Sequence, residues 1–575
     1  MGHVATAADP KQIRRWLETC ERNHGPTCNL GTFATARYRR PMELTLIDVH
    51  NNCLVELSSD SRYVALSYVW GATAMCTALK SNFINLHKRG SLAGSTDLPT
   101  VVQDAMHLVA SLGERYLWVD RLCIVQDAST KHQHLARMDV IFTHALLTIA
   151  AVDGLDANSA LPGVRYGSRL PVLKNERLKE RTCISEPPSL HSVLQDSVYE
   201  SRGWTLQERA LSRRVLYISD QQVYFQCNVS IRSESHTKEK TRKGVKYANW
   251  TIGQRLNEIR LKGSLAEVAV TSLLPTIEIT RDYWLLELPT YQDLVQVYSA
   301  RNLTYPSDIL NAFAGFSSVF EDCCGGPIIH GLPLRVLSVA LLWCQAKDEN
   351  GGQRRRGSNG HLMPSWSWAG WQGPIKYPSL IRAADHSQQV SLSLFSRLED
   401  IEICIESNDL TTQKEQDYSQ INPPLISIIS SLSRDRRRKT NTLRFSAPTA
   451  PCTQFDFEKE ARFGASEHSV IYRNGDPCGV VLSKLELNDL KSHTGVLFVL
   501  VSHDFNQFRR AQLRSTYRVP EPGLEQRSSN PHTVNLLVVK DMGGYYERIA
   551  VAKMYSEAWP RGEKASDQIK MITLA

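Results

Sequence analysis

The feature that most constrains this 575-residue chain is an alternation of short apolar runs with helix-like segments between residues 63 and 152. Tyr63–Trp70, Tyr116–Ile124 and Leu146–Val152 are apolar and β-branched, and each has the length of a buried strand. Apolar residues recur at helical spacing after Pro99 and again from Leu135 to Ala145. This order of strands and helices predicts an α/β fold whose core is a parallel sheet flanked by helices.

Polar side chains gather where these predicted strands end. The ends are Ser67–Gly71, Asp120–Asp127 and Asp153–Gly163, and ligands of parallel sheets bind at the carboxyl ends of the strands. The candidate binding residues there are Ser67, Tyr68, Trp70, Gly71, Asp120, Cys123 and Asp127. The competing interpretation is structural, with aspartates that cap turns and aromatic rings that pack in the core.

Three polar segments, 230–246, 348–360 and 431–441, lack apolar periodicity and suggest linkers or long loops. Between them, Tyr291–Phe316 and Leu332–Cys344 suggest helices, and the short β-branched runs beyond residue 395 suggest a β-rich region. The predicted organisation is an N-terminal segment (residues 1–45), an α/β domain (46–230), a mostly helical connecting region (231–350) and a β-rich C-terminal region (351–575).

The composition excludes several classes of protein. The 67 basic and 59 acidic residues give a net charge of +8, a mild excess that calls for no nucleic-acid partner. The longest apolar run, 332–344, contains Arg335 and is too short for a membrane span. The 13 cysteines and the lack of an apolar signal segment predict reduced thiols and a cytoplasmic location, with the nucleus left open.

Cysteine and histidine residues raise two further hypotheses. Cys20, His24 and Cys28 follow a C-x3-H-x3-C pattern, but Gly25 and Pro26 break the helix that would align them, and no fourth ligand has the spacing of a tetrahedral site. We therefore expect no metal site. A hydrolase that pairs Cys123 with His107 or His144 is the other alternative, although no protease signature surrounds Cys123.

From Tyr63 onward the sequence resembles the HET domain of filamentous fungi, the heterokaryon incompatibility family. The matching blocks, in the expected order, are YVALSYVWG (63–71), LPTVVQDAM (98–106), LGERYLWVDRLCIVQD (112–127), LTIAAVDG (147–154) and RGWTLQERALSRRVLYIS (202–219). LTYPSDILNAFAGF (303–316) and PSWSWAGW (364–371) resemble blocks that accompany the domain. The resemblance implies a protein that triggers programmed cell death on non-self recognition between fused cells.

The same blocks are more distantly similar to TIR domains, which implies a TIR-like parallel sheet. Trp204 and Glu208 match the Trp-x-x-x-Glu motif, whose Glu serves NAD cleavage in active TIR domains, so the resemblance implies a catalytic Glu208 and a substrate-binding Trp204. The opening motif departs from the pattern, because Tyr68-Val69-Trp70-Gly71 stands where plant-type TIR domains have Phe-Arg-Gly. Nucleotide contacts of that Arg are therefore not implied.

Two interpretations of Glu208 remain open. Trp204 and Glu208 share a helix face, and a carboxylate beside an indole could stabilise the oxocarbenium charge that develops as a ribose–nicotinamide bond breaks. Alternatively, Glu208 pairs with Arg209, Arg213 or Arg214 and has a structural role.

At the level of the protein, the alternatives are an NAD(P) glycohydrolase and a non-catalytic signalling module that assembles with partners. Neither needs a cofactor, since NAD would be a substrate. The expected partners are other incompatibility proteins, and a homo-oligomer is left open.

Overall fold

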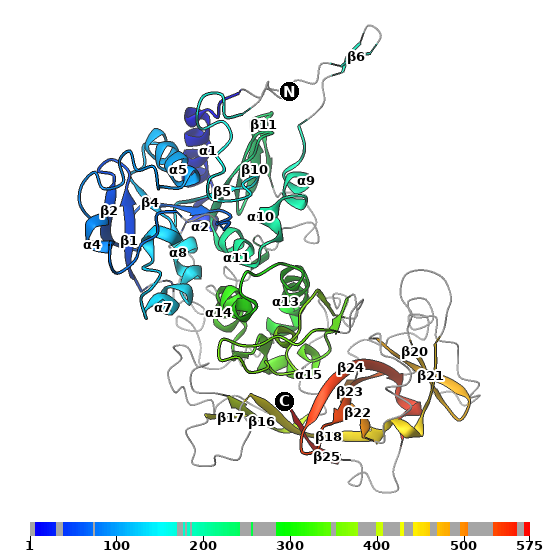
Figure 1. Ribbon diagram of the computed structural model, residues 1–575. Coiled ribbons are helices and arrows are strands. Elements are labelled where there is room, and N and C mark those ends of the chain that lie inside the picture. Colours follow the sequence, from blue (N-terminus) through cyan, green and yellow to red (C-terminus); the bar gives the residue numbers. More distant parts are fainter. Residues whose placement is uncertain are drawn as a thin grey trace, which may run out of the picture. The chain divides into compact units, whose positions relative to one another are not determined.

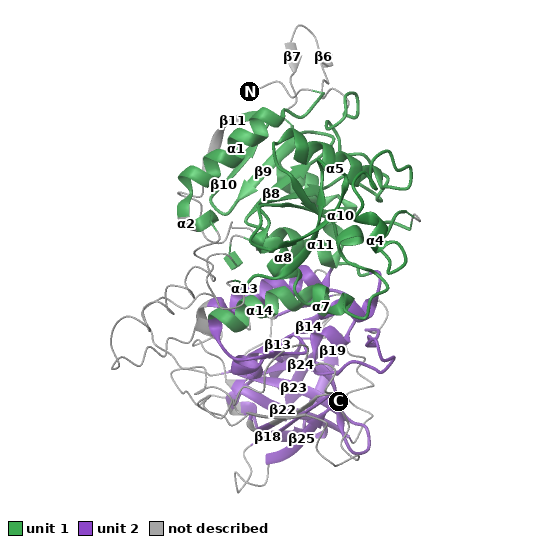
Figure 2. Ribbon diagram, turned by 90° about the vertical axis from the view of Figure 1, so that its left-hand side faces the viewer, with its two compact units in different colours: residues 1–278, 301–303, 311–323 green, residues 279–300, 304–310, 324–575 purple. Residues whose placement is uncertain are grey.

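In the computed structural model, the chain folds into two compact units (Figure 1, Figure 2). Unit 1 comprises residues 1–278, 301–303 and 311–323, and unit 2 comprises residues 279–300, 304–310 and 324–575. The described residues are 6–29, 38, 40–72, 75–169, 176–178, 181–183, 187–241, 253, 255–256, 283–346, 352–377, 398–405, 426–430, 441–459, 469–482, 495–503, 533–560 and 569–575.

Unit 1 contains a mixed sheet whose centre is parallel. Across the sheet the strands are β11 (His236–Thr241), β10 (Ser230–Ser233), β9 (Val223–Cys227), β8 (Arg214–Ile218), β5 (Leu147–Ala151), β3 (Val64–Ser67), β4 (Tyr116–Trp118), β1 (Glu43–Asp48) and β2 (Cys53–Ser58). β9, β10 and β11 are antiparallel to their neighbours on one side, as are β1 and β2 on the other. A further antiparallel hairpin is formed by β6 (Glu176–Leu178) and β7 (Arg181–Cys183).

The predicted parallel pairing is confirmed. Val64 lies opposite Leu117 of β4 and Leu147 of β5, and β5 pairs in parallel with β8. In chain order the parallel strands are β3, β4, β5 and β8, whereas across the sheet they lie in the order β4, β3, β5, β8. Numbered by chain order, this is 2-1-3-4. This is the order of flavodoxin-like doubly wound sheets, in which ligands bind at the switch point between the first and third strands. Here that point lies at the carboxyl ends of β3 and β5.

The central strands are buried on both faces, which explains why they read as continuous apolar runs. Successive side chains alternate between two cores: Leu216 and Ile218 of β8 join the larger core, whereas Val215 and Tyr217 join a smaller one. Helices supply both cores, so the sheet is covered on both sides.

The helices of unit 1 connect these strands. α5 packs against β3 and β4, and α11 packs against β3 and β5. α5 starts directly after Pro99, as predicted, and Gly113 follows its end with a φ of +77° that glycine adopts readily. The helices are α1 (Pro10–Asn23), α2 (Gly25–Cys28), α4 (Phe83–Leu86), α5 (Thr100–Ser111), α6 (Asp120–Cys123), α7 (Lys131–Leu135), α8 (Met138–His144), α9 (Leu190–Gln195), α10 (Val198–Ser201), α11 (Gly203–Leu211) and most of α14 (Ala314–Cys324).

Three sequence-based expectations about local structure are wrong. The apolar run 116–124 is a strand only as far as Trp118, because the chain turns at Val119 into the short helix α6. Residues 230–241, expected to begin a linker, form strands β10 and β11. The run 332–344 is not one helix, because it divides into a 3-10 turn (Leu334–Val336) and the four-residue helix α15 (Leu337–Ala340), with strand residues at both ends. Residues 431–440 of the third expected linker lie outside the described part of the chain.

Unit 2 combines α13 (Tyr283–Ser299) and α15 with a large β-sheet, so the predicted β-rich C-terminal region is confirmed. Trp366 and Trp368 of the PSWSWAGW block are buried within this unit, where the Trp368 indole donates a hydrogen bond to Tyr291 (3.2 Å). The sheet order is β17 (Ile426–Ser430), β16 (Glu399–Ile405), β18 (Thr442–Pro451), β22 (Val496–His503), β23 (Thr533–Asp541), β24 (Tyr546–Tyr555), β21 (Asp476–Val481), β20 (Ser469–Arg473) and β19 (Asp456–Lys459), with β25 (Ile569–Leu574) beside β18 and β24.

Two small antiparallel pairs complete the described strands of unit 2. They are β12 (Ile328–Ile329) with β13 (Leu332–Pro333), and β14 (Cys344–Gln345) with β15 (Ile375–Lys376). Among the described helices of the whole chain, none has both the length and the apolar character needed to cross a membrane.

Candidate functional site

The loops that follow β3 and β5 meet at the switch point of the sheet. The amide of Ala157 donates a hydrogen bond to the Trp70 carbonyl (3.2 Å), which joins the two loops. Gly71 has a φ of +66°, and a Cβ atom at this position would lie 2.4 Å from the Cβ atom of Asp156. The contact therefore requires glycine at residue 71, for its backbone conformation and for the lack of a side chain.

Three buried side chains meet at the end of β3. The Ser67 hydroxyl donates a hydrogen bond to Oε2 of Glu208, and it also shares a hydrogen bond of 2.7 Å with the Tyr199 hydroxyl. Ser67, Tyr199 and Glu208 are only 1%, 0% and 7% exposed. Glu208 projects from α11, and Thr205 of that helix donates to the Tyr199 carbonyl (2.6 Å). These bonds fix the positions of Glu208 and Tyr199 relative to each other.

Part of unit 1 that is distant in sequence holds the start of α11. The amide of Gly203 donates to the Asn302 carbonyl (2.8 Å), and the amide of Asn302 donates to the Ser201 carbonyl (2.7 Å). Farther along the helix, the Gln207 side chain accepts a hydrogen bond from the amide of Gly315 (2.9 Å). The residues around 302 and 315 therefore support the helix that carries Glu208.

Trp70 and Asp120 form a second polar pair beside Ser67. The indole Nε1 of Trp70 donates to Oδ2 of Asp120 (2.7 Å), and the amide of Arg121 donates to Oδ1 (2.7 Å). The Arg121 guanidinium lies over the Trp70 ring, 4.7 Å from its centroid. We call Ser67, Trp70, Asp120, Tyr199 and Glu208 the Glu208 cluster.

Burial dominates the electrostatics of the cluster. It raises the pKa of Glu208 to about 8, with a further contribution from the charge of Asp120, while the Ser67 hydrogen bond and Arg202 act in the opposite direction. Burial also raises the pKa of Asp120 to about 6, and the hydrogen bonds from the Arg121 amide and Trp70 oppose that rise. At neutral pH, Asp120 is therefore mostly ionised and Glu208 mostly protonated. Two neighbouring carboxyl groups in different protonation states are a common basis for acid–base chemistry.

The other predicted site residues take different positions. Tyr68 lies next to the cluster, and burial and the charge of Asp120 raise the pKa of its hydroxyl. Trp204 is partly buried and packs against the larger core, and the Cys123 thiol is buried and accepts a hydrogen bond from the Val119 amide (3.3 Å). Asp127 is exposed and accepts a hydrogen bond from the Lys80 amide (2.9 Å).

The structure does not support the pairing of Cys123 with a histidine. Burial raises the pKa of the Cys123 thiol, which favours the unreactive protonated form. His144 is bound through its ring nitrogens to the carbonyls of Ser59 (3.2 Å) and Tyr38 (2.9 Å), and His107 lies on the pocket side of α5. Neither histidine is a hydrogen-bond partner of Cys123 among the described contacts.

The expected ion pairs of Glu208 are absent from the described part of the chain. Arg209 pairs with Glu200 (2.5 Å), Arg213 donates to the His144 carbonyl (2.9 Å), and Arg214 donates to Sγ of Cys20 (3.1 Å). The ion-pair hypothesis for Glu208 is therefore wrong, and the Ser67 hydroxyl takes the place of the arginines as the partner of its carboxyl group.

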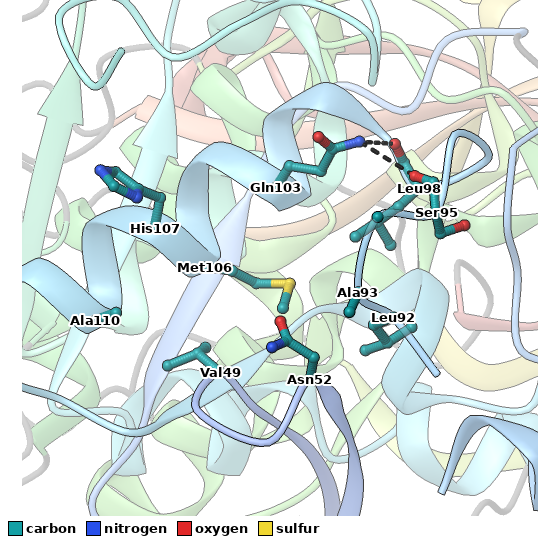
Figure 3. A pocket seen from close by; sticks show the side chains of 11 residues that line it. Val49, Asn52, Leu92, Ala93, Ser95, Leu98, Gln103, Met106, His107 and Ala110 are labelled. Atoms are coloured by element: carbon teal, nitrogen blue, oxygen red, sulfur yellow. Dashed lines mark hydrogen bonds between the residues drawn. The ribbon is translucent and has the colours of Figure 1, made fainter. Parts of the chain in front are cut away.

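A pocket of about 320 Å³ lies elsewhere in unit 1 (Figure 3). Val49 and Asn52 of the β1–β2 turn, the loop 92–98, and Met106 and His107 of α5 line it. No member of the Glu208 cluster is among its lining residues.

Sequence reasoning missed Tyr199 and Arg202 as neighbours of Glu208. Tyr199 precedes the Trp-x-x-x-Glu block by a short stretch that carries no recognisable motif, so its contact with Ser67 required the fold. It also missed Cys227, whose thiol lies 3.3 Å from Nδ1 of His24 although the two residues are 203 positions apart in the chain.

Comparison with known proteins identifies one family. Residues 63–208 match the family model described as Heterokaryon incompatibility protein (HET), a stretch that runs from Tyr63, just before β3, to Glu208. No curated protein and no solved structure matches the chain, so the similarity to TIR domains stays a prediction. The match contains both loops of the switch point and all five members of the Glu208 cluster, and Glu208 is its last residue. Residues 63–208 of the chain are therefore a heterokaryon incompatibility (HET) domain.

Proposed function

We propose that this protein triggers programmed cell death on non-self recognition between fused fungal cells, and that its HET domain does so by hydrolysing NAD at Glu208. The HET domain implies a heterokaryon incompatibility-type function. The observation that carries the enzymatic part is the convergence of Ser67, Asp120 and Glu208 at the switch point, where doubly wound sheets bind ligands. Buried carboxyl groups with raised pKa values at such an edge are typical of functional sites.

The proposed reaction breaks the bond between ribose and nicotinamide. Water adds to the ribose carbon, so NAD⁺ and water give ADP-ribose, nicotinamide and a proton. As the bond breaks, positive charge develops on the ribose, and the Glu208 carboxylate stabilises that charge and orients the ribose hydroxyls. The Trp70 indole, held by Asp120, offers a stacking surface for the nicotinamide or adenine ring.

The burial of Glu208 suggests how such an activity is kept silent. A carboxyl group with a pKa of about 8 is mostly protonated at neutral pH, and a protonated group cannot stabilise positive charge. We infer that the present arrangement is the resting state, and that recognition exposes Glu208 and lowers its pKa. A protein that kills its own cell needs such a restraint.

Two observations favour the second candidate, a non-catalytic signalling module that acts through other incompatibility proteins or through a homo-oligomer. The Ser67 hydroxyl donates a hydrogen bond to Oε2 of Glu208, so this oxygen is already engaged. The pocket beside α5 is lined by no member of the Glu208 cluster. Under this hypothesis the Glu208 cluster is a structural core that positions a surface for partners.

Incubation of the purified full chain with NAD and with NADP distinguishes the two candidates. The assay is run from pH 7 to pH 9, because ionisation of Glu208 increases across that range. Release of nicotinamide that increases with pH supports the glycohydrolase. Hyphal death on expression of the chain, together with no nicotinamide release at any pH, supports the signalling module.

A further inference from the structure

The N-terminal helices bring three potential metal ligands together, despite the helix break that the sequence predicts. Cys20 projects from the last turns of α1, and His24 is the residue at which that helix ends. Gly25 has a φ of +45°, which redirects the chain into the short helix α2 and returns Cys28 to the same side. The glycine therefore brings the ligands together, whereas it was expected to separate them.

Cys227, the last residue of β9, supplies a fourth ligand atom. Its thiol lies 3.3 Å from Nδ1 of His24, and the Cys28 thiol lies 4.0 Å from the same nitrogen. The three sulfur atoms and the nitrogen all lie within 4.8 Å of one another. A tetrahedral ion with bonds of about 2.3 Å to sulfur and about 2.0 Å to nitrogen would place its ligand atoms roughly 3.5–3.8 Å apart. The four atoms need only small adjustments to reach that geometry.

We propose that Cys20, His24, Cys28 and Cys227 bind one structural Zn²⁺ ion. Three thiolates and one imidazole in a tetrahedral arrangement are a common ligand set of structural zinc sites. The three cysteines are free thiols, so no disulfide competes for their sulfur atoms. All four coordination positions come from the protein, which leaves none open for water or substrate and identifies a structural site.

The surroundings balance the charge of such a site. Three thiolates and Zn²⁺ carry a net charge of −1, and the buried guanidinium of Arg214 donates to Sγ of Cys20 (3.1 Å). The Ser230 hydroxyl lies 3.5 Å from Sγ of Cys227, in position to bond the same sulfur. Binding releases the protons of the thiols to solvent. Hydrogen-bond partners of metal ligands, such as Arg214 and Ser230 here, orient the ligands and strengthen metal binding.

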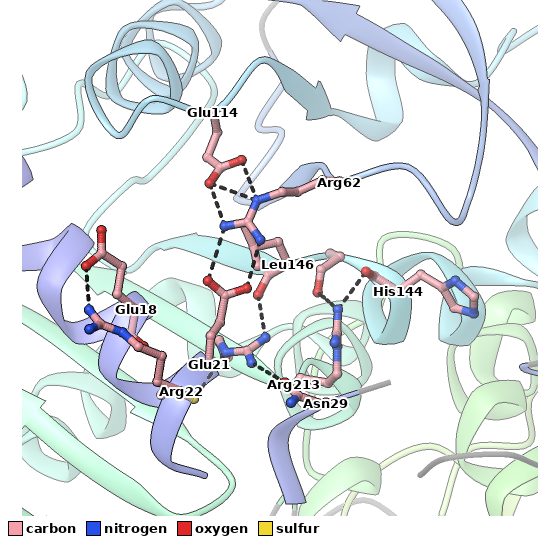
Figure 4. A network of polar contacts seen from close by, with 12 residues as sticks. Glu18, Glu21, Arg22, Asn29, Arg62, Glu114, His144, Leu146 and Arg213 are labelled. Atoms are coloured by element: carbon pink, nitrogen blue, oxygen red, sulfur yellow. Dashed lines mark hydrogen bonds and ion pairs between the residues drawn. The ribbon is translucent and has the colours of Figure 1, made fainter. Parts of the chain in front are cut away.

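The ion would join the N-terminal helices to the sheet of the HET domain. α1 is already attached there by an ion-pair network, in which Arg62 contacts Glu21 (2.8 Å) and Glu114 (2.8 Å) (Figure 4). The Trp16 ring packs near Phe225 of β9, with centroids 6.3 Å apart. The residues before the HET match would then be part of its folded unit, linked to β9 by the metal.

Metal analysis of the purified full chain tests the proposal. We expect about one zinc ion per chain, and, after exchange for Co²⁺, the strong visible and near-ultraviolet absorption of a tetrahedral cobalt–thiolate site. Cys227→Ser should lose most of the zinc. Cys76→Ser is the matched control, because Cys76 is a free cysteine outside the four ligands, and it should keep the zinc.

A variant that preserves the ligand number protects the test against misfolding. His24→Cys supplies a thiolate in place of the imidazole and should keep zinc with a changed cobalt spectrum. The proposal is overturned if the wild-type chain holds no zinc and gives no cobalt–thiolate absorption, if Cys227→Ser keeps as much zinc as the wild type, or if alkylation and mass analysis find a disulfide among the three cysteines.

Discussion

The hydroxyl of Ser67, at the end of β3, is hydrogen-bonded to the buried carboxyl group of Glu208 on α11, and the two residues are 141 positions apart in the chain. They stand near the beginning and at the end of the stretch that matches the HET family. The first and last blocks of the domain therefore meet in the core, where Tyr199 joins them. Substitution of Ser67 should therefore affect both the position and the charge of Glu208.

Removal of the Ser67 hydroxyl should destabilise the HET domain. In Ser67→Ala, the Glu208 carboxyl and the Tyr199 hydroxyl both lose a buried partner, which costs about 1–3 kcal/mol of the free energy of unfolding. The Ser67 hydrogen bond also lowers the pKa of Glu208, so the variant should raise that pKa further. Urea denaturation measures the first effect. Ser81→Ala, at an exposed position, is the control and should change stability by less than about 0.5 kcal/mol.

The parallel centre of the sheet could be predicted because buried parallel strands leave a simple signal, a continuous apolar run followed by helical spacing. The end of β4 could not be predicted, since the run from Tyr116 to Ile124 stays apolar through the turn at Val119 and through α6. Strands β10 and β11 were missed for the opposite reason. Their residues are polar, and the pairing of β10 with β9 and of β11 with β10, rather than apolar periodicity, makes them strands.

The two side-chain clusters show the same limit. Motif similarity pointed to Glu208, Ser67 and Asp120 one by one, but their contacts depend on which strands are neighbours. Tyr199 and Cys227 carry no local pattern, and each reaches its cluster only through the fold. Spacing along the chain can exclude a metal site only when every ligand comes from one segment. Here the fourth ligand, Cys227, comes from a distant strand, so the spacing of the other three did not decide the question.

The stability of the protein should depend on pH through Glu208. The pKa of this group is about 8 in the folded chain and near 4.5 when unfolded, so the folded state holds the proton more tightly. The stabilisation is complete below about pH 4.5 and is lost as the pH rises to 8. Between pH 6 and pH 8.5 we expect the wild type to lose roughly 2–4 kcal/mol relative to Glu208→Gln, as measured by urea denaturation.

The control for this measurement is Glu43→Gln, at the exposed start of β1. It should follow the wild type at every pH. Parallel curves for the wild type and Glu208→Gln would show that the Glu208 carboxyl is not held protonated in the folded chain.

The contact between the two switch-point loops should depend on Gly71. An added Cβ atom would lie 2.4 Å from the Cβ atom of Asp156, at a backbone φ of +66°. Gly90 provides the matched comparison, because its φ is +81° and no atom lies within 4 Å of an added Cβ. Gly90→Ala should cost about 1–2 kcal/mol for the backbone alone, and Gly71→Ala a further 1–3 kcal/mol or so for overpacking. Equal losses in thermal denaturation would mean that the two loops are not in contact.

The most direct test of the proposed function is nicotinamide release at pH 9, where the Glu208 carboxyl is mostly ionised, by the wild-type chain and by Glu208→Gln. Glutamine keeps the shape of the side chain and an oxygen for the Ser67 hydrogen bond, so the variant should fold, but it cannot carry the negative charge that the reaction needs. We expect the rate of NAD cleavage to fall by about 10²–10³-fold and hyphal death to be lost with it, while Glu43→Gln behaves as the wild type. A folded Glu208→Gln chain that releases nicotinamide at the wild-type rate, or that still kills, would contradict the assignment of Glu208 as the catalytic residue.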